Sequence, residues 1–107
     1  MSEGDPIVVV KNDEAHRFEV HAEGHLALAE YEPFDGGIIF THTEVPAELG
    51  GRGIATKLVE AGLADARARG LLVVPRCEVF VRYMQKRPQT HDLLHPAARE
   101  ALGLPAA

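Results

Sequence analysis

The sequence predicts an α/β fold of the α+β type: a mostly antiparallel sheet followed by one strand–helix–strand crossover. Three observations lead to this prediction. Apolar and polar residues alternate in parts of the first 45 residues, apolar residues recur at helical spacing from Ala55 to Ala66, and a short apolar run follows at Leu71–Val74. The expected order of elements is ββββ-α-β-α, and the crossover should be right-handed, as nearly all such connections are.

Four short strands are expected in the first 45 residues. Each candidate is rich in β-branched or aromatic residues or alternates in polarity, and glycine or polar residues separate it from the next. The clearest turn is Asp35-Gly36-Gly37. Because the connections are short, neighbouring strands should pair as an antiparallel meander. The candidate strands are Ile7–Val10, Phe18–Ala22, His25–Glu32 and Ile38–Val45.

A long helix is expected after Pro46, where the period of the apolar residues changes from two to about 3.6. Arg67 and Arg69 suit the last turn of this helix, and Gly70 suits the left-handed position that often follows one. The apolar stripe of the helix consists of Ala55, Leu58, Val59, Gly62, Leu63 and Ala66.

The remaining segments complete the crossover and cover it. Leu71–Val74 is apolar throughout, which is typical of an interior strand. A second helix is expected over Glu78–Arg87, because Pro88 cannot continue it. A last short helix is expected over Pro96–Leu102, closed by Gly103.

The composition fits a single domain over residues 1–107, with its core over about residues 7–94 and frayed ends at 1–6 and 103–107. A chain of 107 residues, 46% of them apolar, can bury a core without cross-links. Its net charge of −5 argues against general affinity for nucleic acid or anionic membranes. The single cysteine excludes an intrachain disulfide. The chain has no apolar run near the ~20 residues that span a bilayer, and its start is unlike a signal peptide, so a cytoplasmic location is expected.

The segment from Val45 to Leu58 is the most informative part of the chain. Three glycines in four positions lie between a strand end and a helix start. Glycine lets backbone N–H groups approach a ligand, and a helix N-terminus attracts anions. Arg52 and Lys57 lie at this end of the helix with no acid before Glu60, although the helix dipole alone would favour acids there. The pattern favours a phosphate site over a plain glycine-rich turn.

Two common phosphate-binding motifs do not fit this segment. The G-x-x-x-x-G-K-[ST] pattern has no match in any register. The dinucleotide pattern G-x-G-x-x-G begins at Gly51 but has Thr56 in its last place, and too little chain follows for the second half of that fold. A nucleotide-binding protein of this type is therefore only a third hypothesis.

The segment resembles the acetyl-CoA loop of the GNAT superfamily of N-acetyltransferases. The usual signature, Q/R-x-x-G-x-G/A, is here Gly50-Gly51-Arg52-Gly53-Ile54-Ala55, with Gly50 in place of Gln or Arg. The runs Thr41-His-Thr-Glu-Val-Pro and Pro75-Arg-Cys-Glu-Val-Phe-Val-Arg-Tyr extend the resemblance to the very small YjdJ-like branch, over roughly residues 7–94. The resemblance implies a minimal GNAT-like fold and acetyl-CoA as the acyl donor.

The resemblance also implies where the cofactor lies. The strand ending at Val45 should splay from the strand at Leu72–Val74, and the pantetheine arm of CoA should enter there and pair with the backbone near Val45. The pyrophosphate should lie on Gly51–Thr56. The implied cofactor-binding residues are Val45, Gly50, Gly51, Arg52, Gly53, Ile54, Ala55, Thr56 and Lys57.

Ordinary members of the superfamily have two extra helices after the first strand, and these shape the acceptor site. This chain has only a short turn there. The resemblance therefore implies an acceptor site open to a bulky or extended amine, on a small molecule or a peptide, or one completed by a second copy in a homodimer.

Acetyl transfer to an amine requires the unprotonated nitrogen. An amine with a pKa of about 10.4 is almost fully protonated at pH 7, so a general base helps. His42 and Glu44 alternate on one face of the strand that leads into the loop, and we expect them to act as base and orienting carboxylate. The alternative is a solvated strand end. Tyr83 resembles the tyrosine that protonates the departing CoA thiolate in the superfamily, although its place in the apolar stripe of the second helix also suits a core role.

Cys77 ends the crossover strand, near where the resemblance puts the thioester. A lone cysteine is usually a small buried hydrophobe, but Arg76 and the helix N-terminus that follows would favour the thiolate. A covalent acetyl-cysteine route is therefore an alternative. His91 and His95 have the spacing of a metal motif, but Pro96 biases His95 away from helical geometry, so no metal site is predicted.

These observations lead to one first hypothesis and one main alternative. The first is an acetyl-CoA-dependent N-acetyltransferase that moves the acetyl group to an amine by direct attack in a ternary complex. The alternative is a non-catalytic acyl-CoA-binding module that docks another protein.

Overall fold

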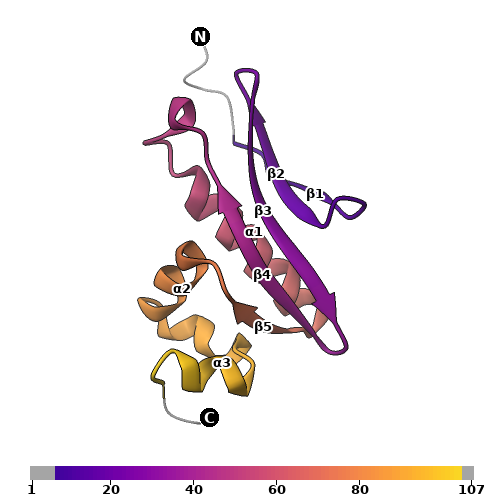
Figure 1. Ribbon diagram of the computed structural model, residues 1–107, viewed down its shortest axis with the longest axis vertical. Helices are drawn as coiled ribbons and strands as arrows, with labels where there is room; N and C mark the ends of the chain where they lie inside the picture. Colours follow the sequence, from indigo (N-terminus) through magenta and orange to yellow (C-terminus); the bar gives the residue numbers. More distant parts are fainter. Residues whose placement is uncertain (1–6, 105–107) are drawn as a thin grey trace.

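The computed structural model describes residues 7–104, and Figure 1 shows the elements in this range. Four strands precede the long helix α1, and the strand β5 separates α1 from α2, which confirms the predicted α+β class and order; a short α3 follows. The strands are β1 (Val10–Asn12), β2 (Arg17–Ala22), β3 (His25–Phe34), β4 (Gly37–Glu44) and β5 (Leu72–Pro75). The helices are α1 (Ile54–Arg69), α2 (Glu78–Gln85) and α3 (Pro96–Ala101), with 3₁₀ turns η2 (Ala47–Leu49) and η3 (Pro88–Leu93).

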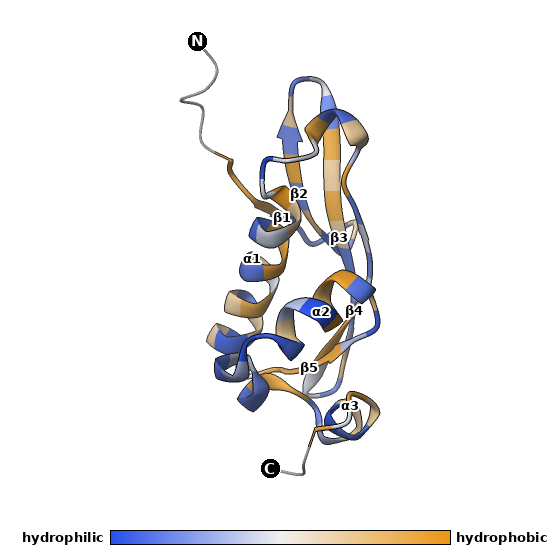
Figure 2. Ribbon diagram, turned by 90° about the vertical axis from the view of Figure 1, so that its left-hand side faces the viewer, coloured by the Kyte–Doolittle hydropathy of each residue, from blue (hydrophilic) through white to orange (hydrophobic). Residues whose placement is uncertain are grey.

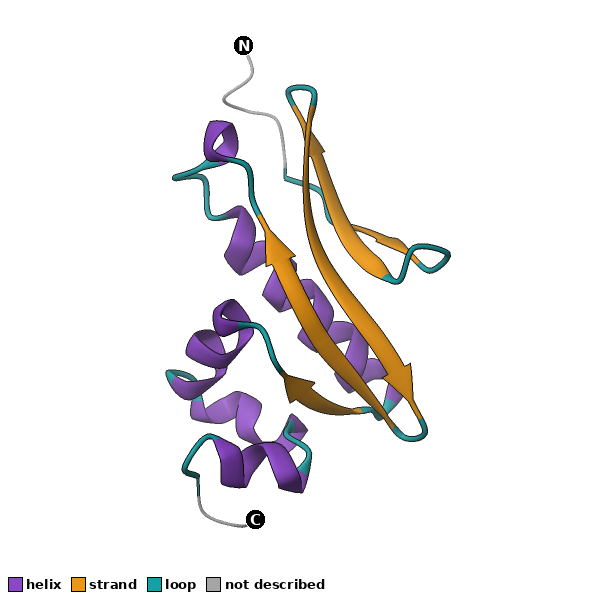
Figure 3. Cartoon of the chain, in the orientation of Figure 1, coloured by secondary structure: helices purple, strands orange, loops and turns teal. Residues whose placement is uncertain are grey.

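The strands form one sheet in the order β1-β2-β3-β4-β5. Pairing is antiparallel from β1 to β4 and parallel between β4 and β5, so α1 is the helix of the crossover. This helix lies across one face of the sheet, in contact with β2 to β5 (Figure 3). Within residues 7–104, the other face of β2 and β3, which we call the outer face, has no helix over it (Figure 2).

The core is centred on Phe40 of β4. Its ring is fully buried and stacks on the ring of Phe80 in α2, with the two ring centroids 4.1 Å apart. A Cβ atom at Gly62 of α1 would lie 2.8 Å from the Phe40 ring, so glycine is what allows this close approach. The buried residues of α1 are Ile54, Leu58, Val59, Gly62, Leu63 and Ala66, which confirms the predicted stripe except that Ile54 replaces Ala55 at its start.

The first strand is displaced from its predicted position. The β-branched run Ile7–Val10 suggested a strand there, but β1 pairs with β2 only over Val10–Asn12. Its register is held by the tight turn that follows and by the side chain of Asn12, which donates to Glu19 of β2 at 3.0 Å. Hydropathy alone did not show this polar contact, and Val10 itself is half exposed.

Other boundaries differ by a few residues. β3 extends to Phe34, β4 ends at Glu44, and α2 ends at Gln85. The two 3₁₀ turns were not predicted; η2 follows Pro46 and η3 begins at Pro88. The predicted frayed ends at 1–6 and 105–107 lie outside the described residues, whereas 103 and 104 both donate backbone hydrogen bonds to α3.

A β-bulge in β4 decides which side chains face the helices. Glu30 pairs with His42, but Tyr31 pairs with Phe40, so Thr41 is an extra residue on β4. Side chains alternate between faces along a strand, and one extra residue reverses the alternation. His42 and Glu44 therefore lie on the outer face, and Thr43 lies on the helix side.

The strands β4 and β5 diverge close to this bulge. They pair from Gly37 and Leu72 as far as Phe40 and Pro75. The backbone N–H groups of the next two residues, 76 and 77, both donate to the Phe40 carbonyl, at 2.9 and 3.2 Å, and the chain then turns into α2. β4 continues to Glu44 beyond the end of β5 and stays paired with β3 there (Figure 3).

Candidate functional site

The loop between η2 and α1 has an open backbone. Gly51 and Gly53 have φ angles of 79° and 72°, in the left-handed region that favours glycine. A Cβ atom built at either position would have no neighbouring atom within 4 Å, so this side of the loop is free for a ligand. Gly50 differs, because its φ of −64° is ordinary and its N–H donates to Ala47 O.

The N-terminus of α1 has no side-chain cap. Gly53 occupies the cap position, and the first turn contains no acidic residue. Lys57 is the first residue whose backbone N–H bonds within the helix, and it donates to Gly53 O at 3.1 Å. Uncapped N–H groups and the helix dipole both attract an anion, so this end of α1 suits a phosphate group.

The two cations predicted at this end have different surroundings. Arg52 forms an ion pair with Glu23 in the β2–β3 turn, so a carboxylate already holds its guanidinium. Lys57 is exposed and has no ion-pair partner among the described residues.

A pocket of about 390 Å³ lies between α1 and α2. Its lining comes from the first half of α1, from α2 and from the residues that follow α2. Its lining includes Thr56, Val59, Arg82, Tyr83, Lys86 and Arg87. The three cations were not among the predicted site residues, although their spacing at i, i+4 and i+5 is visible in the sequence.

Tyr83 lies in this pocket. Its hydroxyl donates to Glu60 Oε2 of α1 at 3.3 Å, and the Arg87 guanidinium lies 3.8 Å from the centre of its ring. Burial, and then the charge of Glu60, raise the pKa of Tyr83. The side chain therefore keeps its proton at neutral pH and is only partly buried, unlike Phe80 and Met84 of the same helix.

Cys77 lies where β4 and β5 diverge. It is the residue before α2, it is partly buried, and its Sγ donates to Thr43 Oγ1 at 3.2 Å. Thr43 was not predicted as a site residue, because only the bulge turns its side chain toward the helices.

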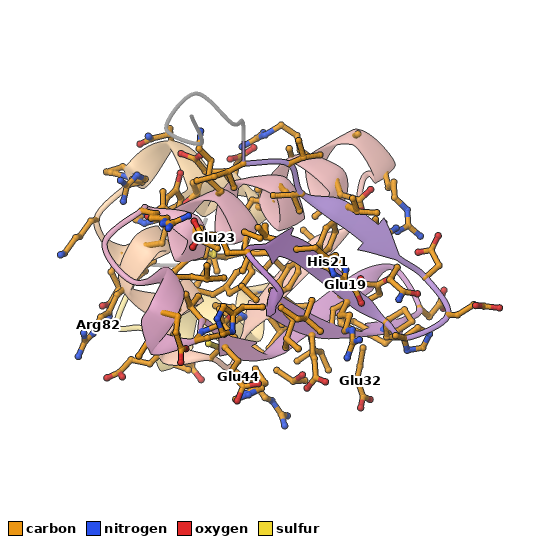
Figure 4. The ribbon with its side chains drawn as sticks, turned by 90° about the horizontal axis from the view of Figure 1, so that it is seen from above. Glu19, His21, Glu23, Glu32, Glu44 and Arg82 are labelled. Carbon is orange, nitrogen blue, oxygen red and sulfur yellow. The ribbon has the colours of Figure 1, made fainter. Side chains whose placement is uncertain are left out.

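His42 and Glu44 lie apart from these residues. Both side chains are exposed on the outer face, and Figure 4 shows Glu44 and Glu32 along the same edge of the molecule. The structure thus places Tyr83 in the pocket and Cys77 against Thr43, while the two predicted base residues lie on the other face of the sheet.

The two histidines with metal-like spacing make local contacts. His91 Nε2 lies 2.7 Å from Met84 O, and His95 Nδ1 accepts from Ala97 N at 3.1 Å as the cap of α3. Within residues 7–104 no group of three or more His, Cys, Asp or Glu side chains is placed to hold a metal ion. No helix in this range is long and apolar enough to cross a membrane.

The fold and the loop together define an α+β acyltransferase: one parallel strand pair diverges beside a glycine loop that leads into an uncapped helix. Residues 17–93 match the family model described as GCN5-related N-acetyl-transferase, and the chain belongs to this family. It is therefore an N-acetyltransferase of the GNAT superfamily. The resemblance to the YjdJ-like branch stays a prediction.

A solved structure has the same fold. The NMR structure of a GCN5-like protein from Staphylococcus aureus is 24% identical and superposes with a TM-score of 0.67 over 85% of this chain and 90% of that chain. At this identity the likeness shows the fold alone. A search among curated proteins gives no match to this chain.

Proposed function

We propose that this protein transfers the acetyl group of acetyl-CoA to an amine by direct attack in a ternary complex. The observation that supports this most is the uncapped N-terminus of α1, reached through a left-handed glycine loop, beside the diverging ends of β4 and β5. The family supplies the acyl-transfer chemistry. The donor, the route and the residues below are the proposal.

The loop and the end of β4 would hold the donor. Among the described residues β5 has no pair with β4 beyond Phe40, so the backbone near Val45 is free to pair with the amides of pantetheine. Lys57, and Arg52 once released from Glu23, would contribute positive charge. The proposed pyrophosphate contacts are the backbone and side chains of Gly50, Gly51, Arg52, Gly53, Ile54, Ala55, Thr56 and Lys57.

Direct attack needs one base and one acid. The proton of the ammonium group would pass to His42, with Glu44 orienting the imidazole or holding the cationic acceptor. The new C–N bond then forms as the C–S bond breaks, and the CoA thiolate takes a proton from Tyr83. The nitrogen loses its second proton to the Tyr83 oxygen, which leaves a neutral amide and restores the hydroxyl. The position of the Tyr83 hydroxyl in the pocket beside α1 supports this role.

The first experiment measures thermal unfolding with acetyl-CoA, CoA, NAD and ATP. A ligand at 100 times its Kd adds about 2.7 kcal/mol, which for a domain of this size raises Tm by on the order of 10 °C. We expect a shift with both CoA species and none with NAD or ATP. Failure of both CoA species to shift Tm would contradict the donor site.

A matched pair of variants controls this experiment. Gly53→Glu and Gly70→Glu make the same change at left-handed positions, with φ of 72° and 67°, at opposite ends of α1. Both variants should be less stable because a side chain strains this backbone conformation. Only Gly53→Glu should lose the response to CoA.

The alternative, a non-catalytic acyl-CoA-binding module, is favoured by one observation: His42 and Glu44 lie on the opposite face of the sheet from Tyr83 and Cys77. A screen of amines with acetyl-CoA separates the two functions. Turnover that falls at least 10²-fold in His42→Ala supports the enzyme, in keeping with the usual size of general-base effects. CoA binding without turnover of any amine supports the module.

The same screen tests the covalent route. Activity that survives in both Cys77→Ala and Cys77→Ser supports direct attack, whereas loss in both supports an acetyl-cysteine intermediate. The acceptor site is predicted either to be open or to be completed by a second copy of the chain. Size-exclusion chromatography measures the oligomeric state and checks the homodimer.

A further inference from the structure

We propose that the hydroxyl of Thr43 donates a hydrogen bond to the carbonyl oxygen of the acetyl group and stabilises the negative charge that develops there during transfer. Thr43 is then a further catalytic residue. The inference rests on the proposed function, because it needs acetyl-CoA bound where β4 and β5 diverge. Three features of the structure carry it: the register of β4, the contact between Thr43 and Cys77, and the place of both residues beside the diverging strands.

The bulge in β4 turns the Thr43 side chain toward the helices. Thr43 pairs with Ala29 of β3, which is fully buried on the helix side of the sheet. Residues directly opposite each other on two strands project from the same face, so Thr43 also lies on that side. Its side chain is partly buried, whereas the neighbouring His42 and Glu44 are exposed on the outer face. The Thr43 hydroxyl is thus sheltered more than any other polar group at this end of β4.

Cys77 occupies one side of this hydroxyl. The Cys77 Sγ donates to Thr43 Oγ1 at 3.2 Å, from the start of α2 to the end of β4. A hydroxyl has one O–H donor and two acceptor sites, so the proton of Thr43 is directed away from the sulfur. Within residues 7–104 no group accepts from the Thr43 hydroxyl. The contact therefore leaves an O–H donor that is oriented and unused.

Thr43 lies close to the point where β4 and β5 part. The two strands stop pairing at Phe40, and Cys77 N donates to the Phe40 carbonyl at 3.2 Å. Thr43 is two residues, or about 7 Å of strand, before Val45. In acetyl-CoA, a short ethylene unit separates the last amide nitrogen of pantetheine from the thioester sulfur. A pantetheine amide paired near Val45 therefore brings the thioester carbonyl within reach of Thr43.

The alternation of β4 places the proposed base and this donor on opposite faces of the strand. His42 projects to the outer face, and the next residue, Thr43, projects to the helix side. An amine that attacks a carbonyl carbon from the outer face pushes the oxygen and the sulfur toward the helix side. Thr43 is there for the oxygen, and Tyr83 of α2 is on the same side for the thiolate. The separation of base and acid across the sheet is then a consequence of the direction of attack.

The test compares the Kd of acetyl-CoA with that of CoA, which lacks the carbonyl, by isothermal titration calorimetry. Thr43→Val removes the hydroxyl and keeps the branched shape. Its Kd for acetyl-CoA should rise by about two- to tenfold, as expected for one neutral hydrogen bond, while its Kd for CoA should not change. Thr43→Ser keeps a hydroxyl and should bind both ligands as wild type does. The matched control is Thr41→Val, the same change at an exposed position of β4, and it should also keep the wild-type values.

Two further measurements follow the carbonyl itself. In the complex with acetyl-CoA labelled with ¹³C at the carbonyl, the NMR resonance should lie further downfield in wild type and Thr43→Ser than in Thr43→Val, because hydrogen bonding deshields a carbonyl carbon. Acetyl transfer to hydroxylamine, a small amine that is largely unprotonated at neutral pH, needs no general base. Its rate constant at saturating acetyl-CoA should fall about 10²-fold in Thr43→Val, the lower end of the cost of losing one oxyanion donor.

The outcomes separate this inference from the proposed function, and a folded thermal transition is required of every variant. A resonance that does not move in Thr43→Val, an equal loss in Thr43→Ser, or an unchanged rate in Thr43→Val overturns the inference and leaves the proposed function standing. A moved resonance without any acceleration by wild type supports the Thr43 contact and contradicts the proposed transfer. Binding of neither ligand by wild type overturns both.

Discussion

At the scale of single residues, Arg52 is held by a carboxylate before any anion arrives. Its pair with Glu23 joins the β2–β3 turn to the glycine loop, and both side chains are substantially exposed. An exposed ion pair is worth about 0.2–1 kcal/mol, so a bound pyrophosphate can displace Glu23 at small cost. The pair therefore acts as a weak competitor of the donor.

Removing this competitor should strengthen CoA binding. Glu23→Gln frees Arg52, and we expect the Kd of CoA to fall by up to about fivefold, the equivalent of 1 kcal/mol. Calorimetric titration at low salt measures this. Glu32→Gln, an equal change of charge at another exposed position, is the control, and an equal gain in both variants would show only a general charge effect.

Glu19 is a residue of the outer face whose chemistry concerns stability. It is almost fully buried and accepts from the side chains of Arg17, His21 and Asn12. Hydrogen bonds from Arg17, then from His21 and Asn12, lower the pKa of Glu19 from 4.5 to about 2. The folded protein thus prefers the charged carboxylate more than the unfolded chain does.

This preference predicts a loss of stability in acid. Because the folded pKa is lower, the stabilisation is complete above pH 4.5 and is lost as the pH falls toward 2. We expect this loss to be about 2 kcal/mol, less than the full shift implies because Arg17 and His21 are partly exposed. Urea unfolding at several pH values measures it. Glu19→Gln should be less stable at pH 7 and should show a flatter profile between pH 4.5 and 2; an unchanged profile contradicts the assignment.

At the scale of elements, the sequence pattern correctly predicted those helices and strands whose positions depend on nearby residues. The 3.6-residue period, Gly70 and the two final arginines of α1 gave the long helix within a residue of its true end. The apolar run Leu71–Val74 correctly predicted the strand β5, which spans Leu72–Pro75. The segment before α1 was predicted to bind a phosphate because three glycines and two cations lie at the start of the helix. The phosphate stays a prediction.

Features that depend on pairing between strands could not be predicted from the pattern of one strand. The bulge at Thr41 comes from how β4 meets β3, and no single strand pattern shows it. A strict alternation would place His42 beside Phe40 under the helices. The bulge moves His42 to the outer face and brings Thr43 to Cys77, so one register shift decides which candidate side chains lie together.

The close packing of α1 against β4 leads to an element-scale prediction. Gly62→Ala would improve the helix propensity of α1 by up to about 1 kcal/mol, but the new methyl group would lie 2.8 Å from the Phe40 ring. Overpacking of this kind costs about 1–3 kcal/mol, so the variant should be less stable by about 1 kcal/mol in urea unfolding.

A double-mutant cycle checks the cause. In a Phe40→Leu background the ring is gone, and Gly62→Ala should cost less or even stabilise. The same cost in both backgrounds would show that the Phe40 ring is not the obstacle.

At the scale of the whole molecule, the chain is elongated, with extents of 48 × 28 × 20 Å. The molecule has two parts, a long arm of β1 to β4 and an end formed by β5, α2 and α3 (Figure 1). The two parts meet along α1 and along the β4–β5 pairing, which has four residue pairs. The glycine loop lies at the N-terminal end of α1, and the α1–α2 pocket lies beside this junction. A donor bound in the loop and the pocket would therefore contact both parts, which are otherwise joined by few strand hydrogen bonds.

Hydrogen exchange should show this bridging directly. With acetyl-CoA at 100 times its Kd, amides at residues 45–57 and 76–87 should exchange on the order of tenfold more slowly, because their loops open locally at low free energy and the ligand stabilises the closed form. Amides of β1 and of the β2–β3 turn should change little, since no proposed contact reaches them apart from the release of Glu23. Protection confined to the outer face would place the donor on the wrong side of the sheet. If all amides were protected equally, the donor would act only on global unfolding. The two parts would then already move as one body without the donor, which contradicts the prediction.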